Sequence, residues 1–156
     1  MSNNLQSRIE SKDAKIGVVG LGYVGLPLAV EFAKAGFSVT GIDIAQERVD
    51  QLNRGDNYIS DVDSSKLSSF VESGRFVATS DYSVVSDLDA VSICVPTPLS
   101  KLKDPDVSFI QSALDELVKY IHSGLLVILE STTYPGTTRE LILPAFTAKG
   151  AEVGKD

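Results

Sequence analysis

The sequence is poor in the residues that build disulfides and metal sites. Its 156 residues include one cysteine, Cys94, one histidine, His122, and no tryptophan. A single cysteine excludes a disulfide framework within the chain, and a single histidine excludes a histidine-rich metal site. Hydrophobic residues make up 43% and charged residues 22%, which is ordinary for a globular domain with its own core.

Basic residues and long apolar runs are also scarce. The 14 Lys and Arg residues stand against 21 Asp and Glu residues, which gives a formal net charge of -7. Because an acidic chain repels phosphate backbones and no basic patch offsets this, we expect no nucleic-acid partner. No apolar run approaches the roughly 20 residues that a membrane helix needs, so we expect no membrane partner. The first residues lack an apolar signal core, and we expect a cytoplasmic protein.

What the sequence does contain is a glycine-rich turn between an apolar strand and a helix. Gly20, Gly22 and Gly25 follow the expected strand 15–19 with the spacing G-x-G-x-x-G. The first glycine permits a tight turn, the second lets a pyrophosphate approach the backbone, and the third lets the helix pack close to the strand. The phosphates would sit at the helix N-terminus, where the dipole favours negative charge. The stretch predicts a dinucleotide-binding turn; the alternative is a turn whose glycines are only structural.

An acidic residue stands where such a turn requires one. Asp43 follows the apolar run 37–42, about 20 residues after the turn, which is the position of the acid that binds the ribose hydroxyls. A 2′-phosphate would meet this carboxylate, and Ile44 supplies no adjacent arginine, so the sequence predicts NAD rather than NADP. Arg48 lies about one helical turn further on. It either contacts the adenosine or pyrophosphate side of the cofactor or is a solvated surface residue.

Short apolar segments alternate with helical patterns along the chain. After a polar, flexible lead-in over residues 1–13, the expected order is β-α-β-α-α-β-β-α-β-α. The expected strands lie at about 15–19, 37–42, 75–79, 90–95 and 125–129, and the later helices at about 46–53, 64–73, 107–121 and 138–148. This alternation predicts an α/β fold of the Rossmann-like, doubly wound kind: a mostly parallel sheet with helices on both faces.

Hydroxyl side chains follow the fourth and fifth expected strands. Thr97 stands between two prolines, which restrict the backbone, so a rigid loop presents its hydroxyl or simply ends the strand. Thr132 lies in a Ser-Thr-Thr sequence, which either lines a cofactor site or caps a helix. Because ligands bind beyond the carboxyl ends of parallel strands, we expect both threonines to lie near the glycine turn and Asp43.

Three further side chains have reactive groups. Cys94 lies inside an apolar strand, so we expect a buried core residue rather than a nucleophile. His122 follows a helix and has no partner pattern, which indicates a surface residue. Glu130 borders the expected cofactor face, but the sequence supplies no partner for it as a catalytic carboxylate.

Four segments together resemble the N-terminal NAD-binding domain of the UDP-glucose/GDP-mannose dehydrogenase family. They are residues 20–29, 41–43, 94–99 and 130–138, and the resemblance extends over about 14–150. The form Glu-Ser-Thr-Thr-Tyr-Pro-Gly-Thr-Thr in the last segment and Val-Pro-Thr-Pro-Leu before it are most similar to UDP-N-acetylglucosamine 6-dehydrogenases.

The resemblance implies an enzyme that oxidises the C6 alcohol of a UDP-sugar to a carboxylate, with two NAD molecules consumed, for surface-polysaccharide precursors. It also implies a supporting catalytic role for Thr132. Beyond the three glycines, the cofactor-binding residues that it implies are Tyr23 and Val24 in the glycine turn, Asp43 and Arg48 at the adenosine ribose, and Thr97 and Thr132 at the nicotinamide end.

The chain also departs from this family. Family members are far longer, and their catalytic cysteine lies in a later domain, in a glycine-rich block that Cys94 does not match. We therefore expect residues 14–156 to be a cofactor domain truncated before the middle and sugar-binding domains. Such a domain binds NAD but does not oxidise a sugar by itself. The resemblance further implies a homodimer for the full-length enzyme.

Two other interpretations stay open at this point. Dehydrogenases of the 3-hydroxyacid or 6-phosphogluconate type also begin with a Gly-Leu-Gly turn, but usually carry methionine where Tyr23 and Val24 stand. A non-enzymatic nucleotide-sensing domain needs the turn and Asp43, but not the loops of Thr97 and Thr132. NAD binding that survives mutation of both threonines would favour the sensing domain.

Overall fold

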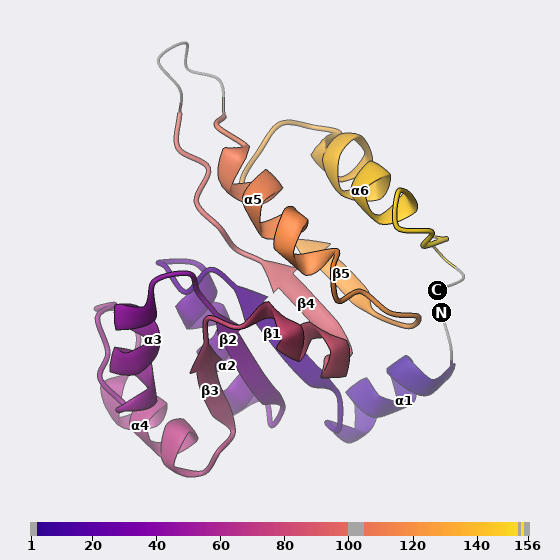
Figure 1. Cartoon of the computed structure of the whole chain (residues 1–156). Helices are drawn as coiled ribbons and strands as arrows, with labels where there is room; N and C mark the ends of the chain where they lie inside the picture. Colours follow the sequence, from indigo (N-terminus) through magenta and orange to yellow (C-terminus); the bar gives the residue numbers. More distant parts are fainter. Residues whose placement is uncertain (1–2, 100–104, 153, 155–156) are drawn as a thin grey trace.

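A five-stranded parallel sheet forms the centre of the molecule (Figure 1). The computed structural model describes residues 3–99, 105–152 and 154. The strand order is β3-β2-β1-β4-β5, and each neighbouring pair is parallel. In chain order the elements are α1 (Asn3–Ser11), β1 (Lys15–Val19), α2 (Gly25–Lys34), β2 (Ser38–Ile42), α3 (Gln46–Asn53), α4 (Ser64–Glu72), β3 (Phe76–Thr79), the 3-10 helix η1 (Tyr82–Asp87), β4 (Ala90–Ile93), α5 (Ser108–Leu117), β5 (Leu126–Leu129), the π-helix η2 (Thr138–Ile142) and α6 (Leu143–Thr147).

The strand order places a topological switch point between β1 and β4. The chain continues from β1 to β2 and β3 on one side of this point, and from β4 to β5 on the other. All five strands end at the same edge of the sheet, where doubly wound folds bind their ligands at the switch point. The predicted Rossmann-like fold is confirmed.

Helices cover both faces of the sheet. Buried residues of α2, α3 and α4 form one core with Val18 of β1, and buried residues of η1, α5, η2 and α6 form the other with Val19. Successive side chains of a strand point to opposite faces, so β1 is buried from both sides. This explains why its sequence is apolar almost without interruption.

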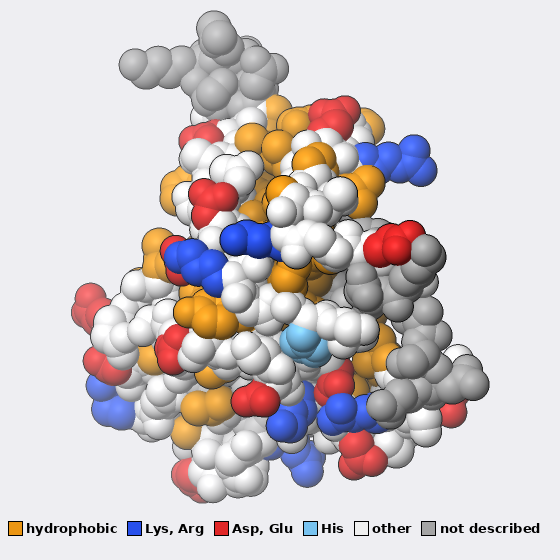
Figure 2. All heavy atoms as spheres, turned by 45° about the vertical axis from the view of Figure 1, so that its right-hand side comes forward, with side chains coloured by type: hydrophobic (Ala, Val, Ile, Leu, Met, Phe, Trp, Pro, Cys, Tyr) orange, Lys and Arg blue, Asp and Glu red, His pale blue; other side chains and the backbone are white. Residues whose placement is uncertain are grey.

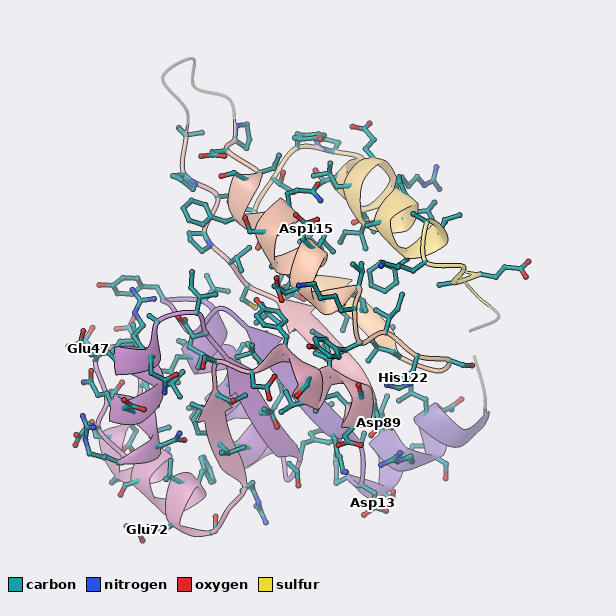
Figure 3. All side chains as sticks on the ribbon, in the orientation of Figure 1. Asp13, Glu47, Glu72, Asp89, Asp115 and His122 are labelled. Atoms are coloured by element: carbon teal, nitrogen blue, oxygen red, sulfur yellow. The ribbon has the colours of Figure 1, made fainter. Side chains whose placement is uncertain are left out.

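The first residues form a helix instead of the expected flexible lead-in. Leu5 of α1 is buried, and Arg8 forms a 2.6 Å ion pair with Asp89, the residue before β4. Asp89 also accepts a 2.7 Å hydrogen bond from the backbone N–H of Lys15. These contacts hold α1 against the amino ends of β1 and β4; Asp89 lies beside α1 in Figure 3. The prediction of a flexible lead-in is wrong. The contact that anchors α1 joins residues 81 positions apart, so no local sequence pattern shows it.

The predicted helix over 138–148 has two parts. It begins as the π-helix η2 and continues as α6 after Ile142. Pro144, in the first turn of α6, has no N–H to donate to the carbonyl four residues earlier, so an ordinary helical turn cannot close there. Within the described part of the chain, no helix is long and apolar enough to cross a membrane.

Candidate functional site

Two glycines of the turn are required by the packing of the turn itself. Gly20 has a φ of +89°, and a Cβ there would lie 2.9 Å from the carbonyl oxygen of Cys94. A Cβ on Gly25 would lie 1.7 Å from the carbonyl oxygen of Gly20. Any side chain at Gly25 would therefore push the start of α2 away from the end of β1.

Gly22 is different, because a Cβ there would meet no atom of the described residues within 4 Å. Among the residues that the structure describes, none accepts a hydrogen bond from the backbone N–H of Gly22, Tyr23 or Val24. These donors precede the first turn of α2, whose dipole adds positive potential at the same place. The geometry suits a bound anion such as a pyrophosphate. Close packing explains why glycine stands at positions 20 and 25. At position 22, glycine leaves open space through which a ligand can approach the backbone.

Asp43 lies against this turn. Its carboxylate is buried, with Oδ2 accepting a 2.9 Å bond from the N–H of Leu21 and Oδ1 accepting a 2.9 Å bond from the N–H of Ala45. Each carboxylate oxygen has a second lone pair, so both can accept a further hydrogen bond from a ribose hydroxyl. The Nη1 atom of Arg48 lies 3.6 Å from Oδ2. The structure thus brings Asp43 and Arg48 together beside the glycine turn.

Tyr58 belongs to the same group, although no sequence signal pointed to it. Its hydroxyl donates a 2.6 Å hydrogen bond to the carbonyl of Leu21, and the Arg48 guanidinium lies 5.9 Å from its ring centre. Burial and the charge of Asp43 raise the pKa of Tyr58 to about 12, against the opposing effect of Arg48. The phenol therefore stays a neutral donor. It lies in an irregular segment between α3 and α4, where neither periodicity nor a motif marks it.

The loops after β4 and β5 are joined by hydroxyl groups. Thr97 Oγ1 donates to the carbonyl oxygen of Thr132, and Ser131 Oγ donates a 2.7 Å bond to the carbonyl of Val95. The side chain of Thr132 is exposed. The two predicted threonines therefore lie together at the carboxyl edge, and a hydroxyl-bearing surface continues from one loop to the other.

Large apolar side chains near the turn are exposed. Tyr23 and Ile44 are each 80% exposed and Val24 is 57% exposed, although buried residues surround them in the sequence. Isolated exposed apolar residues are common, but three beside one carboxylate and one set of open N–H groups form a surface that a flat ligand can cover.

Cys94 lies under the glycine turn as a buried residue, as predicted. Burial and, to a smaller extent, the charge of Glu130 raise the pKa of its thiol to about 11. Since the thiolate is the reactive form, this thiol is a poor nucleophile at neutral pH.

Thiol titration tests this assignment. At pH 8 we expect Cys94 in the folded protein to react with a disulfide reagent about 100-fold or more slowly than an ordinary cysteine, whose pKa is about 8.5. The same protein in guanidinium chloride should show one fully reactive thiol. Rapid, stoichiometric labelling of the folded protein would contradict the buried, protonated state.

His122 and an apolar cavity lie away from this site. His122 is exposed, with Nε2 2.9 Å from the carbonyl oxygen of Leu88, and it lies near α1 in Figure 3. A cavity of about 540 Å³ opens between β5, α6 and α1 and includes none of the predicted cofactor residues. Figure 2 shows the histidine at the surface on this side. No group of three His, Cys, Asp or Glu side chains among the described residues is placed to hold a metal ion.

The turn, the carboxylate and the two loops meet at one switch point, and a comparison with known families shows where this arrangement recurs. The model of the UDP-glucose/GDP-mannose dehydrogenase family, NAD binding domain, matches residues 14–155. The chain belongs to this family. The match confirms the resemblance based on the four segments, and it makes NAD the cofactor of this domain.

Curated relatives of the NAD-binding domain are longer dehydrogenases. This chain is 40% identical over 133 residues to UDP-N-acetyl-D-glucosamine 6-dehydrogenase of Pseudomonas aeruginosa. It is 39% identical over 128 residues to UDP-N-acetyl-D-mannosamine dehydrogenase of Escherichia coli strain K12. These matches cover 85% and 82% of this chain but 31% and 30% of the relatives. The chain thus spans about a third of the length of the relatives that it matches.

Solved structures agree with this placement. An NDP-N-acetyl-D-galactosaminuronic acid dehydrogenase from Methanosarcina mazei superimposes with a TM-score of 0.85 at 33% identity, over 100% of this chain and 36% of that one. GDP-mannose dehydrogenase from Pseudomonas aeruginosa, in a ternary complex, gives 0.83 at 30% identity, over 88% and 33%. The family match sets aside the 3-hydroxyacid or 6-phosphogluconate type.

Proposed function

We propose that the carboxyl edge of this sheet binds NAD as part of an NAD-dependent UDP-sugar 6-dehydrogenase. The observation that carries the proposal is the position of Leu21. Its N–H donates to the Asp43 carboxylate, and the open N–H groups of the turn follow directly after it. A ligand with a pyrophosphate next to a ribose matches this spacing of an anion site and a hydroxyl acceptor.

Each predicted residue has a place in this proposal. The N–H groups of Gly22, Tyr23 and Val24 bind the pyrophosphate. Asp43 accepts the ribose hydroxyls, with Arg48 beside it on the adenosine side.

The nicotinamide end belongs to the loops after β4 and β5. Thr97 holds Thr132 through its backbone carbonyl, and the two threonines line this end of the cofactor. The supporting catalytic role of Thr132 is part of the same proposal. NAD accepts a hydride when bound. Oxidation of a primary alcohol to a carboxylate removes two hydrides, which accounts for two NAD molecules per sugar.

The substrate that we propose is a UDP-N-acetylhexosamine, oxidised at C6 for the synthesis of surface polysaccharides. The support is that curated relatives with about 40% identity carry such names. Cys94, with its buried and protonated thiol, supplies no catalytic nucleophile, so residues 14–155 bind the cofactor without oxidising a sugar. A homodimer, a cytoplasmic location and the absence of a nucleic-acid partner stay predictions.

A side-by-side titration with NAD and NADP tests the cofactor assignment. A ligand at about 100 times its dissociation constant stabilises the native state by about 2.7 kcal/mol, which raises Tm by roughly 5–10 °C for a domain of this size. We expect this shift with NAD and little shift with NADP, because the Asp43 carboxylate repels a 2′-phosphate. A larger shift with NADP, or no shift with either cofactor, would contradict the proposal.

A further inference from the structure

The peptide units on either side of Leu21 are held from two directions. The N–H of Leu21 donates to Asp43 Oδ2 at 2.9 Å, and its carbonyl accepts the hydroxyl of Tyr58 at 2.6 Å. Its side chain is fully buried, and a Cβ on Gly41 would lie 2.8 Å from it, so there is little space for it to shift. The carbonyl that Tyr58 holds belongs to the peptide unit that contains the N–H of Gly22, the first open donor of the turn.

Tyr58 also contacts the adenosine side of the candidate site. Its ring lies 5.9 Å from the Arg48 guanidinium, a distance at which a cation is attracted to an aromatic face. The same guanidinium lies 3.6 Å from Asp43. Arg48 is about half exposed, so without the ring one long ion pair would be the only restraint that the described residues place on its flexible side chain.

These contacts give Tyr58 two separate tasks. We propose that Tyr58 is a positioning residue for the cofactor: its hydroxyl orients the Leu21–Gly22 peptide so that the turn presents its N–H groups to the pyrophosphate, and its ring places Arg48 beside Asp43 for the adenosine. The inference rests on the proposed function, since it assigns a partner to that same site. Tyr58 touches no reacting atom in this arrangement.

The two tasks can be separated by substitution. Tyr58→Phe removes the hydroxyl and keeps the ring, so the pyrophosphate part of the site should weaken while the Arg48 contact survives. Tyr58→Leu removes both. Tyr120→Phe is the matched control, because Tyr120 is half-buried and packs against the core on the other face of the sheet.

Calorimetry with NAD, ADP-ribose and adenosine, on the whole chain, tests the inference. A neutral hydrogen bond contributes about 0.5–1.5 kcal/mol. Tyr58→Phe should therefore lower the affinity for NAD and ADP-ribose by about 3- to 10-fold and leave the affinity for adenosine within about twofold of its original value. Tyr58→Leu should weaken all three ligands. Tyr120→Phe should change none of them.

Several outcomes would overturn the inference. One is that Tyr58→Phe binds NAD with the affinity of the unchanged protein. Another is that Tyr58→Phe loses affinity equally for NAD, ADP-ribose and adenosine, which a merely structural role would produce. If Tyr58→Phe does not fold, Arg48→Met serves in its place, and unchanged NAD binding by that variant overturns the inference. Failure of the unchanged protein to bind NAD is a separate result, which overturns the proposed function itself.

Discussion

Gly25→Ala is expected to destabilise the native state by about 3 kcal/mol or more, and with it to abolish NAD binding. The added Cβ would lie 1.7 Å from the carbonyl oxygen of Gly20, a backbone atom that cannot move away by changing rotamer. Either the end of β1 or the start of α2 must shift, and Val18 of β1 and Leu26 of α2 are buried in the same core. Thermal unfolding should show a Tm lower by about 6–12 °C.

Gly22→Ala is the matched control for this substitution. The added Cβ would meet no atom within 4 Å in the part of the chain that the structure describes, so the fold and its Tm should change little. NAD affinity should nevertheless fall at least about tenfold, because the methyl group would occupy the space through which the pyrophosphate approaches the backbone. If both variants unfold at the same temperature as the unchanged protein, the close approach of α2 to β1 is wrong. If Gly22→Ala binds NAD normally, the turn is only structural.

Asp43→Asn is expected to weaken NAD binding by about 10- to 100-fold, since a hydrogen bond to a charged group contributes about 1.5–3 kcal/mol. It should also lower stability by about 1–3 kcal/mol. Asp43 accepts from two backbone N–H groups, those of Leu21 and Ala45, whereas the amide of asparagine has one acceptor atom. One buried donor would therefore lose its partner. Isothermal titration with NAD and NADP, with thermal unfolding, measures both effects.

Asp50→Asn provides the control for charge alone. Asp50 is an exposed carboxylate on α3 that accepts a 2.8 Å bond from Gln46, which the asparagine oxygen can still accept. This variant should bind NAD normally and keep its Tm. The ratio of NAD to NADP affinity should fall in Asp43→Asn and stay constant in Asp50→Asn. An unchanged ratio in Asp43→Asn would contradict the role of Asp43 at the ribose.

The parts of the site that could be predicted from sequence have local causes. An apolar strand, a tight turn and a closely packed helix each require particular residues at particular spacings. Gly20 provides the tight turn, and Gly25 provides the close approach of the helix. Asp43, Thr97 and Thr132 could be placed at one edge because all parallel strands end on the same side of a sheet. The buried state of Cys94 followed from its apolar neighbours.

The missed parts depend on pairs that are far apart in the chain. Tyr58 and Leu21 are 37 residues apart, and the Thr97–Thr132 hydrogen bond joins residues 35 apart. No local sequence pattern therefore predicts either contact. The docking of α1 depends on Asp89, 81 residues from its partner Arg8. The π-helical start of the last helix follows from Pro144, whose effect on the helix type was not anticipated.

The sequence by itself therefore determined the fold class, the family and the position of Asp43, Thr97 and Thr132 at the carboxyl edge of the sheet. Backbone conformation and burial at those positions allow few residue types, so these residues recur in the sequence as a recognisable pattern. Only the tertiary structure decided that the Tyr58 hydroxyl binds the carbonyl of Leu21 in the turn and that its ring lies beside Arg48. The reason is physical: the strand order β3-β2-β1-β4-β5 brings segments from three crossovers together, and the hydrogen bonds between them exist only after that arrangement has formed.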